Sequence, residues 1–209
     1  MMSHRNNTNN TIVQQDGYQK RYLSHQKRKI NSLLSNYGTT EFRRYNKNEQ
    51  NVFFEILKTR SSQRCFNDEE VGMEPILKAI ELSPSSCDRK GVLIKVLESR
   101  EQKEILSGLL VGGVGWIYRA NKILLLLANM NCYKNPIEQY NMPYLDAGVI
   151  IQTVYLTCES LNYGCCYVNP NIRQENIEFF KNSFSLSDNI LFCGALAIGK
   201  YDKKHKKYE

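Results

Sequence analysis

The longest regular pattern in the chain is an apolar stripe between residues 146 and 163. Asp146 suits the N-cap position that would open a helix here, and Gly164 suits the position just after its end. The side chains of the stripe recur at helical spacing: Ala147, Ile150, Ile151, Val154, Cys158 and Leu161. Because a helix with so continuous an apolar face needs burial along its length, we expect it to form the spine of the core.

Shorter patterns on either side predict strands and further helices. Runs typical of strands cover residues 92–97, 123–128, 165–168 and 190–198. Helical patterns cover residues 48–59, 100–110 and 171–181, with another helix beginning near Pro75. Because this order lacks the regular strand–helix alternation of a doubly wound fold, we expect an α+β domain with a mixed or antiparallel central sheet flanked by helices.

Two local expectations depend on these assignments. In the helix over 48–59, an inward-facing stripe should consist of Val52, Phe53, Ile56 and Leu57. Between the second strand and the long helix, the stretch from Tyr133 to Tyr144 is polar and contains two prolines. A lid over a pocket and a plain surface loop are equally good interpretations of that stretch.

The bulk numbers indicate one main domain with charged ends. The 209 residues carry a net charge of +7 with a pI near 9.0, and much of the excess lies near the two termini. We expect a disordered lead over 1–16, a basic helical extension over 17–48, a folded domain over 49–202 and a basic tail over 203–209. The charge by itself would allow nucleic acid as a partner, but aromatic residues do not interleave with the basic ones, which disfavours it.

Cysteine and histidine usage argues against disulfides and metal. The seven cysteines form an odd set without a C-x-x-C pair, and the histidines lie at positions 4, 25 and 205, outside the core pattern. We therefore expect no metal site and a reducing, cytoplasmic location, with thiols acting as small apolar side chains. The N-terminus has no apolar signal region, and the stretch from Leu109 to Ala128 is interrupted by Arg119 and Lys122, so no membrane span is expected.

The segment from Arg60 to Phe66, with the sequence RSSQRCF, directly follows the predicted helix over 48–59. It brings two guanidinium groups and two hydroxyls into five residues. Arginine stays charged and offers paired donors that match phosphate oxygens, and serine hydroxyls donate to phosphate or to a sugar-alcohol chain. The segment therefore suggests a polyanion cradle, although arginine and serine also commonly satisfy a helix end or cap the next element.

Two later segments extend this pattern: SPSSCDR from Ser83 to Arg89, and LNYGCCYVNPN from Leu161 to Asn171. In this order, the three segments resemble the nitroreductase family of FMN-dependent oxidoreductases. Its pattern opens with R-x-S-x-R-x-F, continues with a P-S-x-x-N-type loop and a long helix ending in glycine, and then has a strand leading to a flavin-contacting loop. The resemblance covers roughly residues 50–200. Within it, Gly108 to Asp146 looks most like nitroreductase-like proteins associated with polysaccharide biosynthesis.

This resemblance implies an FMN site. Arg60, Ser61 and Ser62 would hold the phosphate and the ribityl chain, and Arg64 would face the pyrimidine edge, where a cation stabilises the charge of the reduced ring. The loop from Pro84 to Ser86 would pack on the ring from a second subunit, so that the site spans a homodimer interface. No side chain is assigned as a catalytic acid or base, because the cofactor itself carries the hydride.

The Pro-Ser-Ser loop carries a departure from the family and has a plainer interpretation. Asp88 stands where the family has asparagine and loses the donor half of the amide. It would pair with Arg89 or Arg64, or make the flavin harder to reduce. Taken alone, Pro84, Ser85 and Ser86 are equally typical of a helix stop and a turn.

The last matching residues, Asn169, Pro170 and Asn171, fit the family loop that presents backbone N–H groups near flavin N5. Pro170 has no N–H, so the donors would be those of Asn171 and Ile172. Without the resemblance, the same residues form a turn that feeds a helix, with Asn171 as its cap.

The resemblance therefore predicts a homodimeric FMN-dependent oxidoreductase. It would take hydride from NAD(P)H and pass electrons to a small organic acceptor by a ping-pong route through one site. The alternative is a flavin-binding or degenerate family member that acts as a binding or assembly module, with its basic N-terminal helix meeting the partner. Asp88 and the short C-terminus favour this alternative.

Overall fold

A computed structural model describes residues 20–31 and 43–201 of the chain. The chain divides into two compact units, residues 1–47 and residues 48–209. In the first unit, residues 20–31 form a helix whose side chains are exposed. The lead expected over 1–16 and the tail expected over 203–209 lie outside the described residues, and the expected domain boundaries stay predictions.

The second unit is built on a four-stranded antiparallel sheet with the strand order β1-β2-β4-β3. The strands are β1 Val92–Leu97, β2 Lys122–Asn129, β3 Gly164–Val168 and β4 Ile190–Gly199. Each contains the apolar run from which the sequence predicted it. The pairing is antiparallel throughout, which decides between the mixed and the antiparallel sheet.

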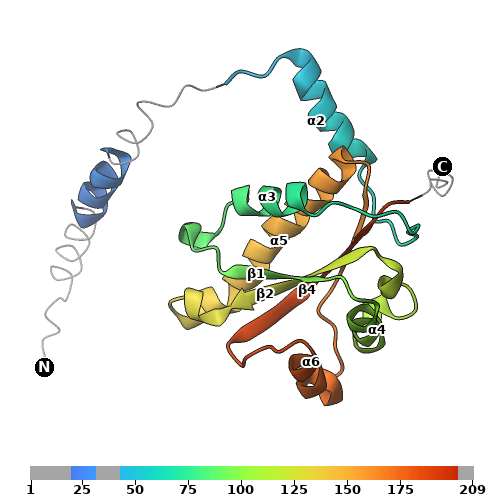
Figure 1. The fold of residues 1–209 in the computed structure, drawn as a ribbon. Helices are drawn as coiled ribbons and strands as arrows, with labels where there is room; N and C mark the ends of the chain where they lie inside the picture. The colour runs from blue at the N-terminus through green and yellow to red at the C-terminus, as the bar shows by residue number, and fades with distance from the viewer. Residues whose placement is uncertain (1–19, 32–42, 202–209) are drawn as a thin grey trace, which may run out of the picture. The chain divides into compact units, whose positions relative to one another are not determined.

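Helices cover both faces of this sheet, with α3 and α5 on one side and α4 and α6 on the other (Figure 1). Their bounds are α3 Glu74–Leu82, α4 Arg100–Leu109, α5 Pro136–Ser160 and α6 Ile177–Ser183. Along β2, Leu124 and Leu126 belong to the core on the α5 side, whereas Ile123 and Leu125 belong to the core on the α4 side. Because β2 is buried on both faces, it needs the continuous apolar run that its sequence has. The antiparallel sheet with helices on both faces confirms the predicted α+β fold.

The remaining helical elements are short or lie at the edge of the domain. Their bounds are α2 Lys47–Thr59, η1 Ser86–Asp88, η2 Val111–Gly113, η3 Ile117–Arg119, η4 Met130–Cys132 and η5 Gln174–Asn176. The helix expected over 171–181 is therefore divided into η5 and α6. Within the described ranges, no helix is both long and apolar enough to cross a membrane.

Helix α5 begins ten residues before the predicted start. Asn135 is its N-cap, accepting a hydrogen bond from the backbone N–H of Glu138, and Pro136 occupies the first turn. The interpretation of Tyr133 to Tyr144 as a lid or surface loop was therefore wrong. Asp146 is not a cap but a buried residue inside the helix. The sequence misled because Pro143, which normally disfavours a helix interior, is accommodated inside α5.

Helix α2 forms where it was predicted, but its apolar side chains are not covered by the described chain. Val52, Phe53 and Phe54 are 60%, 50% and 63% exposed. The expected inward stripe was therefore wrong for Val52 and Phe53. Helical periodicity identifies an apolar face but does not say which surface covers it, and here no described element packs over these side chains.

Gly194 of β4 is the most constrained glycine of the sheet. Its φ is +117°, and a Cβ there would lie 2.5 Å from Tyr167 Cε2 and 2.7 Å from the carbonyl oxygen of Val168. We expect Gly194→Ala to lower the free energy of unfolding by about 2–4 kcal/mol in urea denaturation, because both backbone strain and overpacking result.

The matched control for this substitution is Gly108→Ala in α4. A Cβ at Gly108 meets nothing within 4 Å, so helix propensity predicts a gain of roughly 0.5–1 kcal/mol. If Gly194→Ala and Gly108→Ala changed the free energy of unfolding similarly, the close contact of Gly194 with Tyr167 and Val168 would be contradicted.

Candidate functional site

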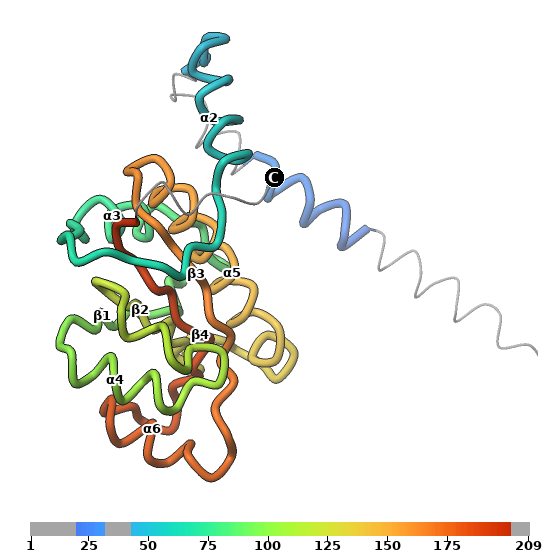
Figure 2. The backbone as a smooth tube through the Cα atoms, turned by 90° about the vertical axis from the view of Figure 1, so that its right-hand side faces the viewer, coloured from blue at the N-terminus to red at the C-terminus, as the bar shows by residue number. Residues whose placement is uncertain are grey.

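The segment from Arg60 to Phe66 leaves the end of α2 and runs beside β3 (Figure 2). Ser62 forms a parallel bridge with Cys165, and the backbone N–H of Gln63 donates to the carbonyl of Cys165 at 2.9 Å. The segment is thus held in extended form against a buried strand, which is a rigid mounting for a binding group.

Both arginines of this segment rest on aromatic rings. The guanidinium carbon of Arg60 lies 5.0 Å from the ring centroid of Tyr155, and that of Arg64 lies 5.9 Å from the ring centroid of Trp116. No carboxylate in the described part of the chain forms an ion pair with either arginine. A cation held over a ring keeps the N–H donors at its edge available, so both arginines suit an external anion.

The two serines between these arginines also offer donors. Ser61 Oγ accepts a hydrogen bond from Gln63 Nε2 at 2.9 Å, which leaves the hydroxyl proton of Ser61 for another acceptor. Ser62 Oγ lies 3.0 Å from the phenol oxygen of Tyr155. The structure therefore brings the four predicted residues Arg60, Ser61, Ser62 and Arg64 into one stretch of polar donors.

Tyr155 is the part of this arrangement that sequence analysis missed. Its side chain is 8% exposed, and burial raises the pKa of its phenol. A signal was present: Tyr155 lies four residues after Ile151 and three residues before Cys158, which both belong to the predicted apolar stripe. A tyrosine on a buried stripe implies a hydroxyl that needs a partner inside the protein.

The loop after β3 lies beside the glycine-rich turn that follows α4. The backbone N–H of Val111 donates to the carbonyl of Asn171 at 3.0 Å. A Cβ at Gly112 would lie 3.0 Å from Val168 Cγ1 and 3.7 Å from Asn169 Oδ1. Trp116, which supports Arg64, donates its indole N–H to the carbonyl of Gly112 at 2.9 Å. This turn therefore connects the arginine segment with the predicted loop over residues 169–171.

The backbone donors predicted in that loop are engaged within it. The N–H of Asn171 donates to the carbonyl of Asn169 at 2.8 Å, and the N–H of Ile172 donates to the carbonyl of Pro170 at 3.2 Å. Asn171 is not a helix cap either, because Arg173 is the residue that precedes η5. The interpretation of residues 169–171 as a turn was thus correct, and the interpretation of Asn171 as the cap of the next helix was wrong.

The predicted loop from Pro84 to Asp88 lies elsewhere on the molecule. Asp146 holds it: Asp146 Oδ1 accepts from the backbone N–H of Ser86 at 2.8 Å and from its hydroxyl at 2.7 Å. Asp146 Oδ2 accepts from the phenol of Tyr133 at 3.1 Å. Asp146 and Tyr155 are nine residues apart in α5, which corresponds to about 13 Å along the helix axis. A single chain therefore does not bring this loop next to Arg60 and Arg64.

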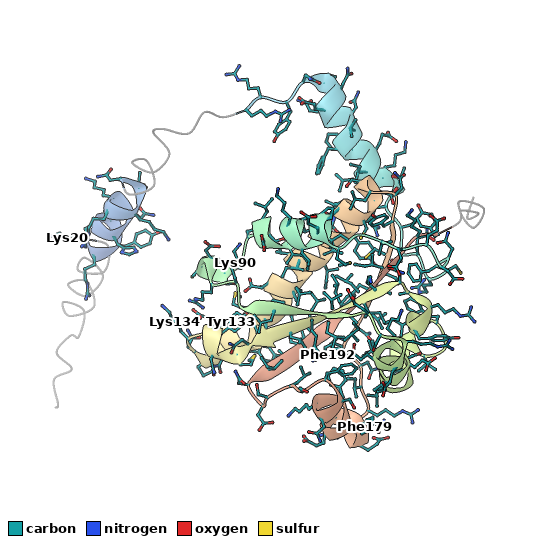
Figure 3. The ribbon with its side chains drawn as sticks, in the orientation of Figure 1. Lys20, Lys90, Tyr133, Lys134, Phe179 and Phe192 are labelled. Atoms are coloured by element: carbon teal, nitrogen blue, oxygen red, sulfur yellow. The ribbon has the colours of Figure 1, made fainter. Side chains whose placement is uncertain are left out.

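Asp88 has a partner that the sequence did not predict. Its carboxylate lies 3.2 Å from Lys90 Nζ, while Arg89 donates to Glu138 of α5 at 2.6 Å. The expected pairing of Asp88 with Arg89 was therefore wrong, and a pairing with Arg64 of a second subunit stays a prediction. Lys90 and Tyr133 lie at the end of the domain where α5 begins (Figure 3). Asp88 and Lys90 lie in the same turn, where both have left-handed φ angles.

The thiols next to the arginine segment are buried. Burial raises the pKa of Cys165 and of Cys166, and for Cys166 the nearby Arg64 acts in the opposite direction. Protonated thiols in this setting are poor nucleophiles. All cysteines of the described chain are free, as the odd number without pairing motifs predicted.

Comparisons with known proteins relate the second half of the chain to a family. A model of the nitroreductase family matches residues 109–200. The protein named FMN reductase (NAD(P)H) from Bacillus subtilis is 29% identical over 159 residues, which span 66% of this chain and 64% of that protein. The chain thus spans slightly less than two thirds of the length of this curated relative.

Solved structures agree on the architecture. NfrA2 of B. megaterium has a TM-score of 0.66 at 20% identity, and the protein described as the hypothetical oxidoreductase YcnD of Bacillus subtilis has a TM-score of 0.64 at 26% identity. Each similarity covers 75% of this chain and 69% of the other. The described domain therefore has a nitroreductase-like fold. In its fold, and over the matched residues 109–200, the chain is thus similar to proteins of the nitroreductase family.

Proposed function

We propose that this chain is an FMN-dependent oxidoreductase that takes electrons from NAD(P)H and passes them to a small organic acceptor. The main support is the pair of arginines Arg60 and Arg64. Each guanidinium group lies over an aromatic ring, and neither forms an ion pair with a carboxylate of the described chain. Guanidinium groups without a carboxylate partner on a rigid segment suit an anionic ligand, and the curated relative is named for FMN and NAD(P)H.

The residues of the segment fit the polar end of FMN. In this proposal Arg60, Ser61 and Ser62 hold the phosphate and the ribityl hydroxyls, since all three present donors. Arg64 faces the pyrimidine edge of the ring. When bound, FMN supplies the hydride chemistry itself, so that the chain's own residues bind, orient and exclude water.

A second copy of the chain completes the proposed site. The loop with Pro84, Ser85, Ser86 and Asp88 is held about 13 Å along α5 from the arginine segment, so a partner subunit would have to supply it. The exposed apolar side chains of α2 favour such a partner, because water-facing phenylalanines at Phe53 and Phe54 gain from burial. We therefore propose a homodimer with two shared sites.

Several finer features belong to the same proposal. One site serving both substrates implies a ping-pong order, in which the nicotinamide leaves before the acceptor enters. Asn169, Pro170 and Asn171 border the ring in this arrangement. The free cysteines suit a reducing compartment, for which we propose the cytoplasm. A role in polysaccharide biosynthesis stays a prediction from the sequence, and the relatives described above give it no support.

One observation favours the alternative, a flavin-binding module without turnover. The N–H groups of Asn171 and Ile172, which the family resemblance assigns to flavin N5, donate to carbonyls of their own turn. A loop that keeps these bonds would not offer donors to a reacting ring. The module and the enzyme would share the cofactor and differ in whether NAD(P)H reduces it.

Spectroscopy of the purified protein separates the possibilities. The enzyme should be yellow, and its flavin absorbance should bleach when NADPH or NADH is added without oxygen. A yellow protein that neither nucleotide bleaches would support the binding module instead. A colourless protein that does not take up FMN at micromolar concentration would rule out both.

A further inference from the structure

From its position in α5, Tyr155 contacts two residues of the arginine segment and the backbone of β3. Its ring lies beneath the guanidinium group of Arg60, at 5.0 Å. Its phenol oxygen lies 3.0 Å from Ser62 Oγ and accepts a hydrogen bond from the backbone N–H of Tyr167 at 2.8 Å.

The hydrogen bonds around Tyr155 have a preferred direction. The backbone N–H of Tyr167 can only donate, so the phenol oxygen accepts there. A phenol is a stronger donor than an alkyl alcohol, and burial raises the pKa of Tyr155, so that it keeps its proton. When the phenol donates to Ser62 Oγ, the proton of Ser62 is left for another acceptor. Within the described chain the neighbouring Cys166 thiol is such an acceptor, but sulfur accepts weakly, so an anion outside the segment is the better one.

We infer that Tyr155 is a positioning residue that makes the arginine segment selective for a phosphate monoester. The hydroxyl of Tyr155 orients the proton of Ser62 toward the ligand, and its ring fixes Arg60 beside that proton. The phosphate dianion is then bound by two aligned donors, the Ser62 hydroxyl and the Arg60 guanidinium group. Chains of hydrogen bonds polarise one another, which strengthens the last donor of the series. The inference rests on the proposed function, because it names what the same site recognises: the phosphate group of FMN.

The test compares FMN with riboflavin, which lacks the phosphate. Both are titrated into apoprotein by quenching of flavin fluorescence, for the wild type and for Tyr155→Phe, which keeps the ring beneath Arg60. We expect the dissociation constant for FMN to rise about tenfold, the loss that corresponds to one hydrogen bond to a charged group. The constant for riboflavin should stay within about twofold of the wild type.

Tyr167→Phe is the matched control. It removes another partly buried phenol, whose hydroxyl donates to the carbonyl of Cys193 at 2.8 Å, and it leaves the backbone N–H of Tyr167 in place. Both dissociation constants should be unchanged in this variant. A purely structural effect of losing a buried hydroxyl would appear in both variants and for both flavins.

A double-mutant cycle adds a second readout. Ser62→Ala should cost as much FMN affinity as Tyr155→Phe, and the double variant should cost little more than either, because both act through the same proton. If Tyr155→Phe does not fold, Ser62→Ala by itself should still reduce the preference for FMN over riboflavin.

The possible results have distinct meanings. Equal weakening of FMN and riboflavin by Tyr155→Phe, or no weakening of either, would overturn the inference and leave the proposed function intact. Additive effects in the cycle would also overturn it. A wild-type protein that binds neither flavin would overturn the proposed function, and the inference with it.

Discussion

The variant in which both Arg60 and Arg64 are replaced by alanine is expected to fold and to emerge from purification without FMN. Each guanidinium group rests on a ring, Tyr155 or Trp116, and has no carboxylate partner in the described chain. A hydrogen bond from a charged donor contributes about 1.5–3 kcal/mol. Losing one such bond from each arginine should therefore raise the dissociation constant for FMN by roughly two to four orders of magnitude.

Flavin absorbance per chain after desalting, followed by titration of FMN into apoprotein, measures this effect. The control is the double variant Lys78→Ala and Arg100→Ala, which removes the same charge from exposed positions on α3 and α4. The control separates a specific site from general attraction of an anion by a basic protein. Wild-type occupancy in the Arg60 and Arg64 variant would show that the cofactor lies elsewhere.

The largest expected effect on stability is at Asp146. This buried carboxylate accepts from the backbone and the hydroxyl of Ser86 and from the phenol of Tyr133. In Asp146→Ala all three donors lose their acceptor, and each buried unsatisfied donor costs about 1–3 kcal/mol. We expect the free energy of unfolding to fall by roughly 3–5 kcal/mol, a large part of what a domain of this size has.

Urea denaturation with a spectroscopic probe measures this loss. Asp188→Ala is the control, because that carboxylate is 96% exposed and its ion pair with Lys181 should contribute under about 1 kcal/mol. Asp146→Asn should lie between the two, since it keeps one oxygen acceptor. A loss below about 1 kcal/mol for Asp146→Ala would mean that other contacts hold the loop around Ser86.

Asp146 also matters for the geometry of that loop. Cys87, Asp88 and Lys90 have φ angles of 51°, 54° and 50°, in the left-handed region that side chains rarely adopt. Such a conformation persists only when its surroundings impose it. The contacts of Ser86 with Asp146 and of Arg89 with Glu138, both from α5, impose it here.

The strands and most helices could be predicted because their signals are local. Six consecutive apolar residues from Ile123 to Ala128 can be satisfied only on a strand covered on both sides, and β2 is such a strand. The start of α5 was predicted wrongly because Pro143, a residue that normally disfavours a helix interior, is buried inside this helix. The prediction that the apolar stripe of α2 faces inward was wrong for a different reason. Helical periodicity identifies an apolar face, but it does not say which surface covers that face.

For the candidate site, too, some features could be predicted from the sequence and others could not. Arg60, Ser61, Ser62 and Arg64 were identifiable because the chemistry of phosphate recognition requires those residue types, and they are adjacent in the chain. Which rings lie under the two arginines was not identifiable, although Tyr155 lies on the predicted apolar stripe. Trp116 and Tyr155 lie more than fifty residues away in sequence, and only the packing of the turn after α4 and of α5 against β3 brings their rings under the arginines.

By itself, the sequence determined the α+β class and the four strands, and it identified one segment as a candidate anion-binding site, since these depend on residue type and short-range spacing. The tertiary structure decided which groups orient that segment, what holds the loop at Ser86, and that this loop is far from the arginines within one chain. The physical reason is that contacts between distant segments depend on helix ends and strand register. A shift of a few residues at the start of α5 turns Asp146 from a cap into a buried anchor.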